Sequence, residues 1–258
     1  MQNLRVSLVQ TFLHWEDKTA NLQQLEARLT PLAGHTDLII LPEMFTTGFS
    51  MNPAKLAEKM DGTTIQWLAT QAQRLDAVIT GSFIAEAQGN FYNRLVWMRP
   101  DGSFETYDKR HLFTYADEQH YYTPGKQRLV VELKGWKIMP LICYDLRFPV
   151  WSRNTEHYDL LIYVANFPER RNYAWKSLLV ARAIENQSFT IGVNRIGNDG
   201  NDIYYAGDSC LIDFSGQVIH QVSHLENIFT TSLNYTSQLE FRKRFAFLQD
   251  QDQFEIMN

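Results

Sequence analysis

The chain has 258 residues, of which 45% are hydrophobic and 21% are charged, as is ordinary for a soluble globular protein. A net charge of −5, with no basic run longer than Lys109-Arg110-His111, disfavours nucleic acids and anionic membrane surfaces as partners, because both are bound by clustered Lys and Arg. No window approaches about 18 consecutive apolar residues, which excludes a spanning helix, and two cysteines without a C-x-x-C pattern favour a reducing cytoplasm over a disulfide scaffold.

Short apolar runs predict strands, and apolar residues repeating every three or four positions predict helices. The predicted elements, in chain order, are a strand at Leu4–Val9, a helix at Asp17–Leu29, a strand at Asp37–Leu41, a helix at Thr63–Leu75, strands at Ala77–Ala85, Asn93–Met98, Leu129–Leu133, Lys137–Cys143 and Leu160–Ala165, a helix at Arg170–Asn186, and strands at Phe189–Val193 and Val218–Val222. Asp101-Gly102 and Ser215-Gly216 are typical of hairpin turns.

No repeat, low-complexity tract or Pro/Gly/Ser-rich linker divides the chain. We therefore expect residues 1–258 to form a single α/β domain, with mixed strands and helices on the outer faces. Three polar and aromatic segments, Glu43–Pro53, His111–Lys126 and Arg195–Gly207, are predicted to be loops that carry functional groups. The aromatic C-terminal residues 235–258 are expected to pack either on the domain's own core or on a dimer partner.

Three reactive or charged side chains follow strand-like runs. Glu43 ends the run that starts at Leu38, Lys109 follows a strand that begins near Ser103, and Cys143 ends the run that starts at Pro140. Because ligand sites of layered α/β folds form outside the carboxyl ends of strands, we expect these side chains to converge on one pocket. A base, a cation and a nucleophile make a complete set for acyl transfer.

In such a set, Cys143 attacks the carbonyl, Glu43 moves the proton from the thiol to the leaving amine, and Lys109 stabilises the oxyanion together with the backbone N–H of Tyr144. Each residue also has an ordinary structural interpretation, because free Cys is among the most buried residue types and strand-end charges are often merely solvated. Phosphate-binding and zinc-binding patterns are absent and the seven histidines lack ligand spacing, so we expect no metal.

Three local sequences resemble the signature blocks of the nitrilase (carbon–nitrogen hydrolase) superfamily and follow one another in that family's order. They are Leu41-Pro42-Glu43-Met44-Phe45, Tyr107-Asp108-Lys109-Arg110-His111-Leu112-Phe113 and Ile142-Cys143-Tyr144-Asp145-Leu146-Arg147-Phe148-Pro149. Two further segments, 181–186 and 207–209, resemble structural blocks of the same family. Within the superfamily, the chain is most similar to bacterial ω-amidases.

The resemblance implies a four-layer αββα sandwich that forms a homodimer through one αββα face. It also implies a catalytic triad of Glu43, Lys109 and Cys143, without metal or organic cofactor. Some members of the family carry a second active-site glutamate, for which Glu118 is the matching candidate. The ω-amidase branch acts on 2-oxo acid amides such as 2-oxoglutaramate, so a small amide is the expected partner.

Such a substrate carries a carboxylate, which Arg147 could bind, because a guanidinium binds carboxylate bidentately. The alternative for Arg147 is a structural ion pair with Asp145 or Glu185. Three aromatic side chains of the loops are candidates for the pocket wall: Phe45, Phe113 and Tyr121. Ordinary core packing explains each of them equally well.

Other functions remain open at this point. A nitrilase, carbamoylase or aliphatic amidase would share the same triad. A papain-like Cys–His hydrolase would use His111 as its base, but the apolar strand before Cys143 argues against the helix that such enzymes require. A non-catalytic protein of this kind would bind a small acid or use Cys143 as a redox sensor. A sensor needs a resolving cysteine, and nothing marks Cys210 as that partner.

Overall fold

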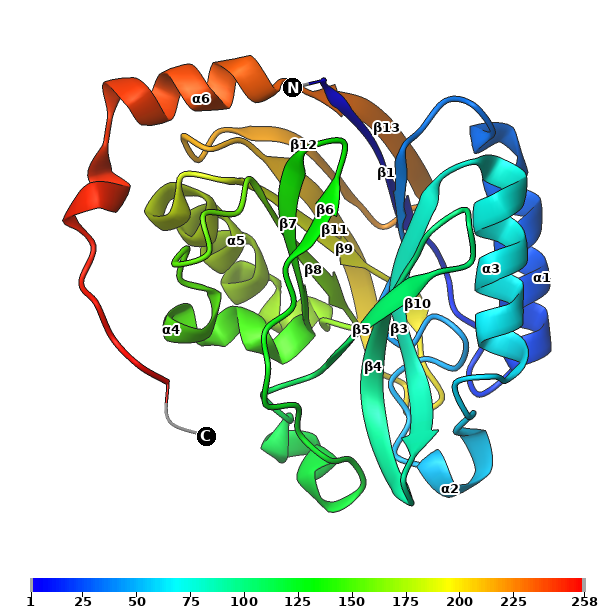
Figure 1. The fold of residues 1–258 in the computed structure, drawn as a ribbon. Coiled ribbons are helices and arrows are strands. Elements are labelled where there is room, and N and C mark those ends of the chain that lie inside the picture. Colours follow the sequence, from blue (N-terminus) through cyan, green and yellow to red (C-terminus); the bar gives the residue numbers. More distant parts are fainter. Residues whose placement is uncertain (1, 257–258) are drawn as a thin grey trace.

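The computed structural model describes residues 2–256 and arranges them in four layers, with two β-sheets lying between outer helices (Figure 1). The first sheet has the order β13-β1-β2-β3-β4-β5, formed by β1 (Leu4–Gln10), β2 (Leu38–Ile40), β3 (Val78–Ala87), β4 (Asn90–Met98), β5 (Phe104–Asp108) and β13 (Asn227–Leu233). The second has the order β10-β11-β9-β8-β7-β6 with β12 paired to β11, formed by β6 (Val131–Leu133), β7 (Trp136–Ile142), β8 (Leu160–Ala165), β9 (Phe189–Asn194), β10 (Ile196–Asn198), β11 (Tyr204–Ile212) and β12 (Val218–Ser223). The helices are α1 (Lys18–Leu29), α2 (Pro53–Leu56), α3 (Thr63–Leu75), α4 (Pro149–Ser152), α5 (Asn172–Asn186) and α6 (Tyr235–Arg244).

Alternation along the strands of the first sheet creates its two packed faces. In β2, Leu38 and Ile40 join the core between the two sheets, whereas Ile39 joins a separate core under α1 and α3. The helices supply residues such as Leu25 and Leu68 to that outer core. Because successive strand residues point to opposite faces, a continuous apolar run is the pattern that such a doubly covered strand requires.

The outer face of the second sheet is covered by α5. Trp175, Leu179 and Ala183 of this helix are fully buried, as their spacing predicts. The approach is close at Gly192 in β9, where a Cβ atom would lie 2.6 Å from both the Trp175 ring and the Leu179 side chain. Two sheets, each with its own helical cover, give the αββα sandwich that the family resemblance implied.

Most predicted elements are confirmed, two of them to the residue. The strand Leu160–Ala165 and the helix Thr63–Leu75 have the predicted bounds, and both predicted hairpin turns join antiparallel neighbours. The prediction that Arg195–Gly207 is entirely a loop was wrong, because it contains β10 and the start of β11. Strand β13 and helix α6 lie in segments for which the sequence predicted no bounded element.

Helix α6 is attached to its own chain by hydrogen bonds. Gln238 donates to the Asp159 carbonyl at 2.8 Å, and Arg242 donates to the Asp159 carboxylate at 2.9 Å and to the Tyr158 carbonyl at 2.7 Å. Beyond the helix, the chain continues along the same side of the molecule as α4 and α5 (Figure 1). Phe247 in this segment is 62% exposed.

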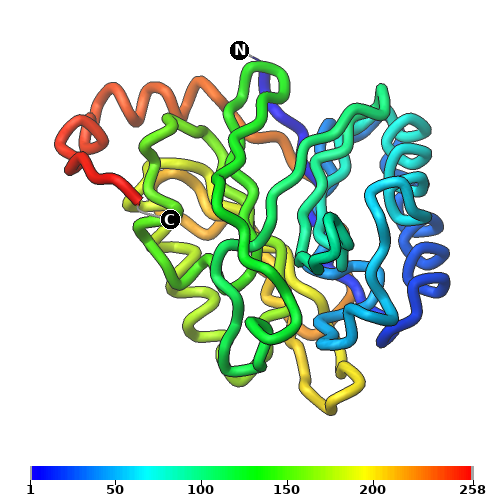
Figure 2. The backbone as a smooth tube through the Cα atoms, turned by 60° about the horizontal axis from the view of Figure 1, so that its bottom comes forward, coloured from blue at the N-terminus to red at the C-terminus, as the bar shows by residue number. Residues whose placement is uncertain are grey.

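The turned view brings forward the end of the molecule where the functional loops meet (Figure 2). The segments near residues 50, 115 and 200, coloured light blue, green and yellow, gather there although they are far apart in the chain. Strands β1, β2 and β3 are parallel to one another, and so are β7, β8 and β9. In each set, the carboxyl ends of the strands therefore lie at the same edge of the sheet. The fold therefore collects strand-end residues from both sheets.

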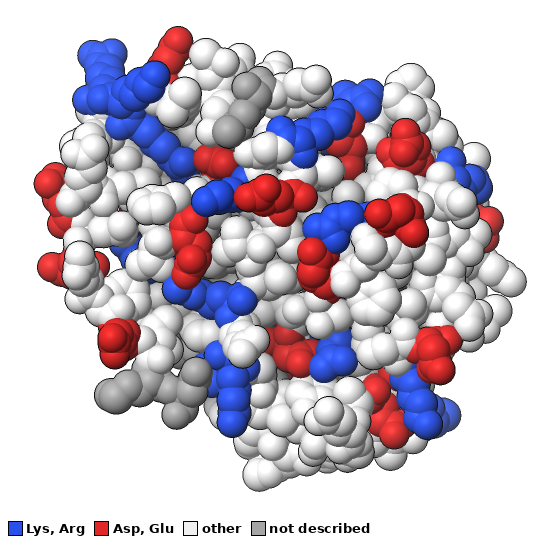
Figure 3. All heavy atoms as spheres, in the orientation of Figure 1, with Lys and Arg blue, Asp and Glu red and all other residues white. Residues whose placement is uncertain are grey.

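Basic and acidic side chains are interspersed on the face shown in Figure 3. A basic group stands at the upper left, over the end of α6, whose last turn holds Arg242, Lys243 and Arg244. Among the helices of residues 2–256, none has the length and apolar character needed to cross a membrane.

Candidate active site

The structure brings together the three strand-end residues that the sequence singled out. Lys109 directly follows β5, Cys143 directly follows β7, and Glu43 lies shortly after β2. The Lys109 Nζ atom donates to Glu43 Oε1 at 2.9 Å, and Lys109 and Cys143 line the same cavity. Glu43 and Lys109 are 0% and 1% exposed, so their charges face each other away from bulk water.

The Glu43 carboxylate is held by donors from both sheets. Besides Lys109, Asn93 Nδ2 of β4 donates to Oε1 at 2.7 Å, and the backbone N–H of Asn166, just after β8, donates to Oε2 at 2.8 Å. The Asn166 side chain also donates to the Glu43 carbonyl at 2.6 Å. Both carboxylate oxygens are therefore fixed in direction, as an acid–base group requires.

Lys109 is shared between two carboxylates. Its Nζ atom lies 3.0 Å from each oxygen of Glu118, which also accepts the backbone N–H of Phe113 at 2.5 Å. Burial alone would lower the pKa of Lys109, but the charges of Glu118 and Glu43 outweigh it and hold the pKa above its ordinary value. Burial raises the pKa of Glu118, against the opposing charge of Lys109.

Cys143 stands at a sharp turn between β7 and a short 3-10 helix, Cys143–Arg147. Its φ angle is +43°, a left-handed conformation that costs a non-glycine residue about 1–3 kcal/mol and is often found at functional sites. The Sγ atom lies 3.9 Å from the Asn166 carbonyl oxygen. Burial raises the pKa of this thiol, and the charge of Glu43 raises it further. The resting group is thus a thiol that needs a base.

One buried carboxylate connects the segment carrying Lys109 with the turn carrying Cys143. Asp145 Oδ1 accepts the backbone N–H of His111 at 3.0 Å and contacts its Nδ1 at 2.8 Å. Oδ2 accepts the Tyr107 hydroxyl at 2.7 Å and the Ile142 N–H at 3.1 Å. The His111 ring is also stacked on Phe148 at a centroid distance of 3.8 Å. His111 therefore braces the site, and this geometry disfavours a papain-like pairing with Cys143.

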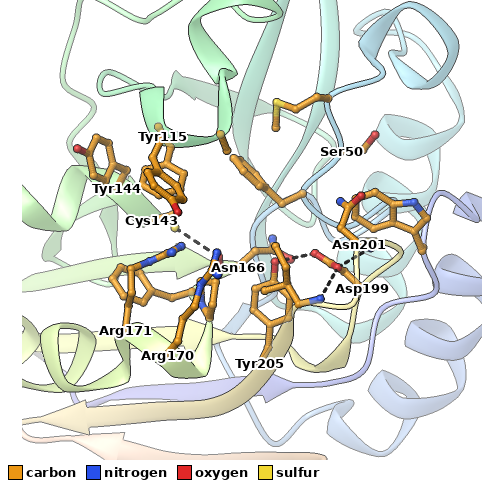
Figure 4. A pocket seen from close by; sticks show the side chains of 18 of the residues that line it. Ser50, Tyr115, Cys143, Tyr144, Asn166, Arg170, Arg171, Asp199, Asn201 and Tyr205 are labelled. Carbon is orange, nitrogen blue, oxygen red and sulfur yellow. Dashed lines mark hydrogen bonds between the residues drawn. The ribbon is translucent and has the colours of Figure 1, made fainter.

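A cavity of about 490 Å³ opens in front of the thiol. Figure 4 shows Cys143, Tyr144, Tyr115, Arg170 and Arg171 toward one end, Ser50, Asp199 and Asn201 toward the other, and Asn166 between them. The further lining residues are Trp15, Glu16, Phe49, Met51, Asn52, Lys109, Phe113, Ala116, Arg147, Phe167, Pro168, Ile203 and Tyr205. Such a concave space, which combines aromatic rings with polar and charged groups, is typical of a small-molecule site.

Only some of the residues predicted to contact the substrate lie at the cavity. Phe113, Tyr144 and Arg147 line the cavity. The Arg147 guanidinium lies over the Phe167 ring at 5.9 Å and, within residues 2–256, forms neither of the two ion pairs considered for it.

Two aromatic predictions were wrong. Phe45 is fully buried in the core beneath α3, at 6.1 Å from the Trp67 ring, with room left by Gly81 of β3, which carries no Cβ. Tyr121 is 45% exposed, and its neighbour Tyr122 is the buried one, donating its hydroxyl to the Ser50 carbonyl. Tyr121 stands directly at the end of the 3-10 turn Glu118–His120, and Tyr122 follows it.

Sequence reasoning missed three residues of the site: Asn93, Asn166 and Arg171. Asn166 could have been found, because it ends the apolar run of β8 as Cys143 ends that of β7. Asn93 and Arg171 carry no such signal. The other cysteine, Cys210, is 2% exposed, and burial raises its pKa to about 12. In residues 2–256 there is no group of three His, Cys, Asp or Glu side chains that could hold a metal ion.

Comparison with known proteins gives concordant similarities. A family model described as carbon-nitrogen hydrolase matches residues 5–239. The protein Omega-amidase YafV from Escherichia coli (strain K12) is 42% identical over 261 residues, which cover 99% of this chain and 100% of that one. A 2-oxoglutaramate amidase from Bacillus subtilis (strain 168) is 33% identical over 251 residues, covering 95% of this chain and 96% of that one.

A solved structure is also similar over the whole length. XC1258 from Xanthomonas campestris, described as a CN-hydrolase superfamily protein with an arsenic adduct in the active site, has a TM-score of 0.98 and 48% identity, with 100% of both chains covered. Nit3 from Saccharomyces cerevisiae, a member of branch 10 of the nitrilase superfamily, has a TM-score of 0.85 at 24% identity, with 95% of this chain and 94% of that one covered, and agrees in fold alone.

Proposed function

The chain belongs to the carbon–nitrogen hydrolase family, and from that premise we propose that it is an ω-amidase. Its substrates are small 2-oxo acid amides such as 2-oxoglutaramate and 2-oxosuccinamate, which it hydrolyses to the dicarboxylate and ammonia. The identity of 42% to Omega-amidase YafV over 99% of this chain supports the substrate class. The observation that carries the chemistry is a buried thiol at a cavity wall beside the Glu43–Lys109–Glu118 array.

In the acylation step, Cys143 Sγ attacks the amide carbonyl carbon while Glu43 takes the thiol proton. Coupling the two events suits a thiol whose pKa is raised, since little free thiolate would otherwise be present. Glu43 then gives the proton to the amide nitrogen, the C–N bond breaks, and ammonia leaves a thioester on Cys143.

The tetrahedral oxyanion formed in each step needs donors directed at it. Lys109 supplies a fixed positive charge, because its pKa is held above the ordinary value by two carboxylates. Tyr144 supplies a backbone N–H from the first turn of the 3-10 helix that begins at Cys143, where N–H groups have no partner within the helix.

Deacylation reverses the proton movements with water as the nucleophile. Glu43 takes a proton from water as the hydroxyl adds to the thioester carbonyl. It then gives this proton to Sγ as the C–S bond breaks, which releases the acid and returns the Cys143 thiol. Glu118 is the second carboxylate that holds Lys109, with both of its oxygens at 3.0 Å from Nζ. We assign it the role of keeping the ammonium oriented through both steps.

The test is ammonia release from 2-oxoglutaramate by the wild-type protein and by Cys143→Ala and Glu43→Gln. We expect turnover by the wild type and none above background for either variant, with melting temperatures that show both to be folded. Full activity of Cys143→Ala would refute the mechanism. A nitrile, an N-carbamoyl amino acid and an aliphatic amide, assayed beside the keto amide, test the family's other activities, and a higher kcat/KM for any of them would replace the ω-amidase assignment.

We further propose that residues 1–258 act as one catalytic unit in the cytoplasm and form a homodimer through the outer face of the second sheet's helical layer. Exposed apolar side chains on that side support a second copy as the partner: Val150 is 54%, Ile184 52% and Phe247 62% exposed. Light scattering on a sizing column should give twice the chain's mass, and Ile184→Lys should give the monomer. A wild-type monomer at micromolar concentration would contradict this proposal.

A further inference from the structure

Three arginines line the cavity close to the thiol: Arg147, Arg170 and Arg171. Within residues 2–256, none of them has a carboxylate within 4.0 Å, and none of their guanidinium groups donates a hydrogen bond to the chain. Arg147 and Arg170 are exposed at the rim, whereas Arg171 is only partly exposed. The cavity thus has a cationic end whose charge the chain itself does not balance.

Arg171 is fixed in position by aromatic rings. Its guanidinium carbon lies 4.9 Å from the centroid of the Phe113 ring and 5.9 Å from that of Phe167, and both rings line the cavity. Arginine stacks well on aromatic faces, and the stacked planar group keeps its N–H edges free for a ligand. Figure 4 shows Arg171 at the same end of the cavity as Cys143.

This position is unfavourable for folding. Arg171 immediately precedes α5, whose N-terminus carries a partial positive charge that disfavours a cation. Burial lowers the pKa of its guanidinium, and the charges of Arg170 and Arg147 lower it further. A half-buried guanidinium that receives neither a hydrogen bond nor a counter-ion from the chain is costly, and an anionic ligand would relieve that cost.

We propose that Arg171 is a specificity-determining residue of this enzyme, which binds the α-carboxylate of the substrate and so selects 2-oxo acid amides over uncharged amides. The inference rests on the proposed function and adds to it the side chain that recognises the acid group. Arg147 and Arg170, at the rim, raise the local concentration of anionic substrate through their charge. Phe113 and Phe167 act through Arg171 by holding its plane.

The experiment compares kcat/KM for 2-oxoglutaramate with kcat/KM for butyramide, which has no carboxylate. In Arg171→Gln, we expect the ratio of the two to fall about 10- to 150-fold, the range for losing one charge-assisted hydrogen-bonded contact. Arg171→Lys should recover part of the ratio. Arg170→Gln should lower it in a salt-dependent manner, because its effect acts through space, whereas the loss in Arg171→Gln should persist at high salt. Arg74→Gln on α3 is the matched surface control and should match the wild type.

Melting temperature separates recognition from a structural role. Because Arg171 sits in an unfavourable field with no hydrogen bond, Arg171→Gln should melt at the wild-type temperature or above it. An unchanged selectivity ratio would refute the proposal, and so would an equal loss on both substrates combined with a lower melting temperature.

Binding of 2-oxoglutarate keeps the inference separate from the proposed function. In a Cys143→Ala background, calorimetry should give a Kd for 2-oxoglutarate that Arg171→Gln raises at least 10-fold. If the wild type failed to hydrolyse 2-oxoglutaramate, the proposed function would fall, while this binding comparison would still decide the role of Arg171. A Kd that Arg171→Gln leaves unchanged would overturn the inference by itself.

Discussion

Replacing Asp145 by Asn should damage both stability and catalysis, although Asp145 does not line the cavity. Its two oxygens accept from four donors: the Tyr107 hydroxyl, the Ile142 N–H, and the N–H and Nδ1 of His111. Asparagine offers one acceptor oxygen and one NH₂ group. Two of the four donors would therefore point at the NH₂ group, which cannot accept a hydrogen bond. The residue is 0% exposed, and water cannot take the lost positions.

The magnitude follows from those contacts. A hydrogen bond to a charged group contributes about 1.5–3 kcal/mol, so losing two costs about 3 kcal/mol at the lower end of that range. For a chain of this size, that cost lowers Tm by about 6–12 °C. Catalysis should fall as well, because Asp145 fixes the turn at Cys143 relative to the segment that carries Lys109, and a misplacement of about 1 Å can cost about 100-fold in rate.

Scanning calorimetry and ammonia release from 2-oxoglutaramate test this prediction. Asp252→Asn, at an exposed position, is the matched control and should leave Tm within about 1 °C of the wild type. If Asp145→Asn melted and turned over like that control, the network around Asp145 would have no part in aligning the site.

Two further predictions concern protons. Because the charge of Glu43 contributes to the raised pKa of Cys143, Glu43→Gln should make alkylation of Cys143 by iodoacetamide titrate at lower pH, even though turnover is lost. A profile that stays in place or moves to higher pH would contradict this effect of the Glu43 charge. Burial raises the pKa of Glu118 in the folded protein above its ordinary value of 4.5. The contribution of this shift to the free energy of unfolding is therefore complete below pH 4.5, and it is lost as the pH rises through the raised pKa. The free energy of unfolding of the wild type minus that of Glu118→Gln should therefore decrease across this window in denaturant titrations, and a difference that is flat or increasing would contradict it.

The reactive residues could be predicted because their signal is local. Glu43 and Cys143 end apolar strands that are covered on both faces, and such strands are readable in a single sequence. The carboxyl ends of parallel strands meet at one edge, so proximity followed from topology. Glu118 was found only through family resemblance, since its contact with Lys109 depends on the path of a loop.

Other parts of the molecule carry no periodic signal. Helix α6 buries a single residue, Gln238, and is attached through hydrogen bonds of Gln238 and Arg242, so no apolar stripe marks it. Strand β13 pairs with β1 at the edge of its sheet with mostly half-buried residues. Phe45 and Tyr121 were assigned to the pocket by neighbourhood in sequence, but the direction of a loop side chain depends on turns that composition does not reveal.

In the proposed mechanism, Cys143 carries the acyl group of a small amide during hydrolysis. Mixing the protein with 2-oxoglutaramate, quenching with acid within the first turnovers and locating the adduct by mass spectrometry tests this most directly. We expect an added mass equal to the substrate minus ammonia on the Cys143 peptide, removed by hydroxylamine, and none on the Cys210 peptide. Steady turnover with Cys143 unmodified at every quench time and no hydroxamate formed when hydroxylamine is added, or full turnover by Cys143→Ala, would contradict it.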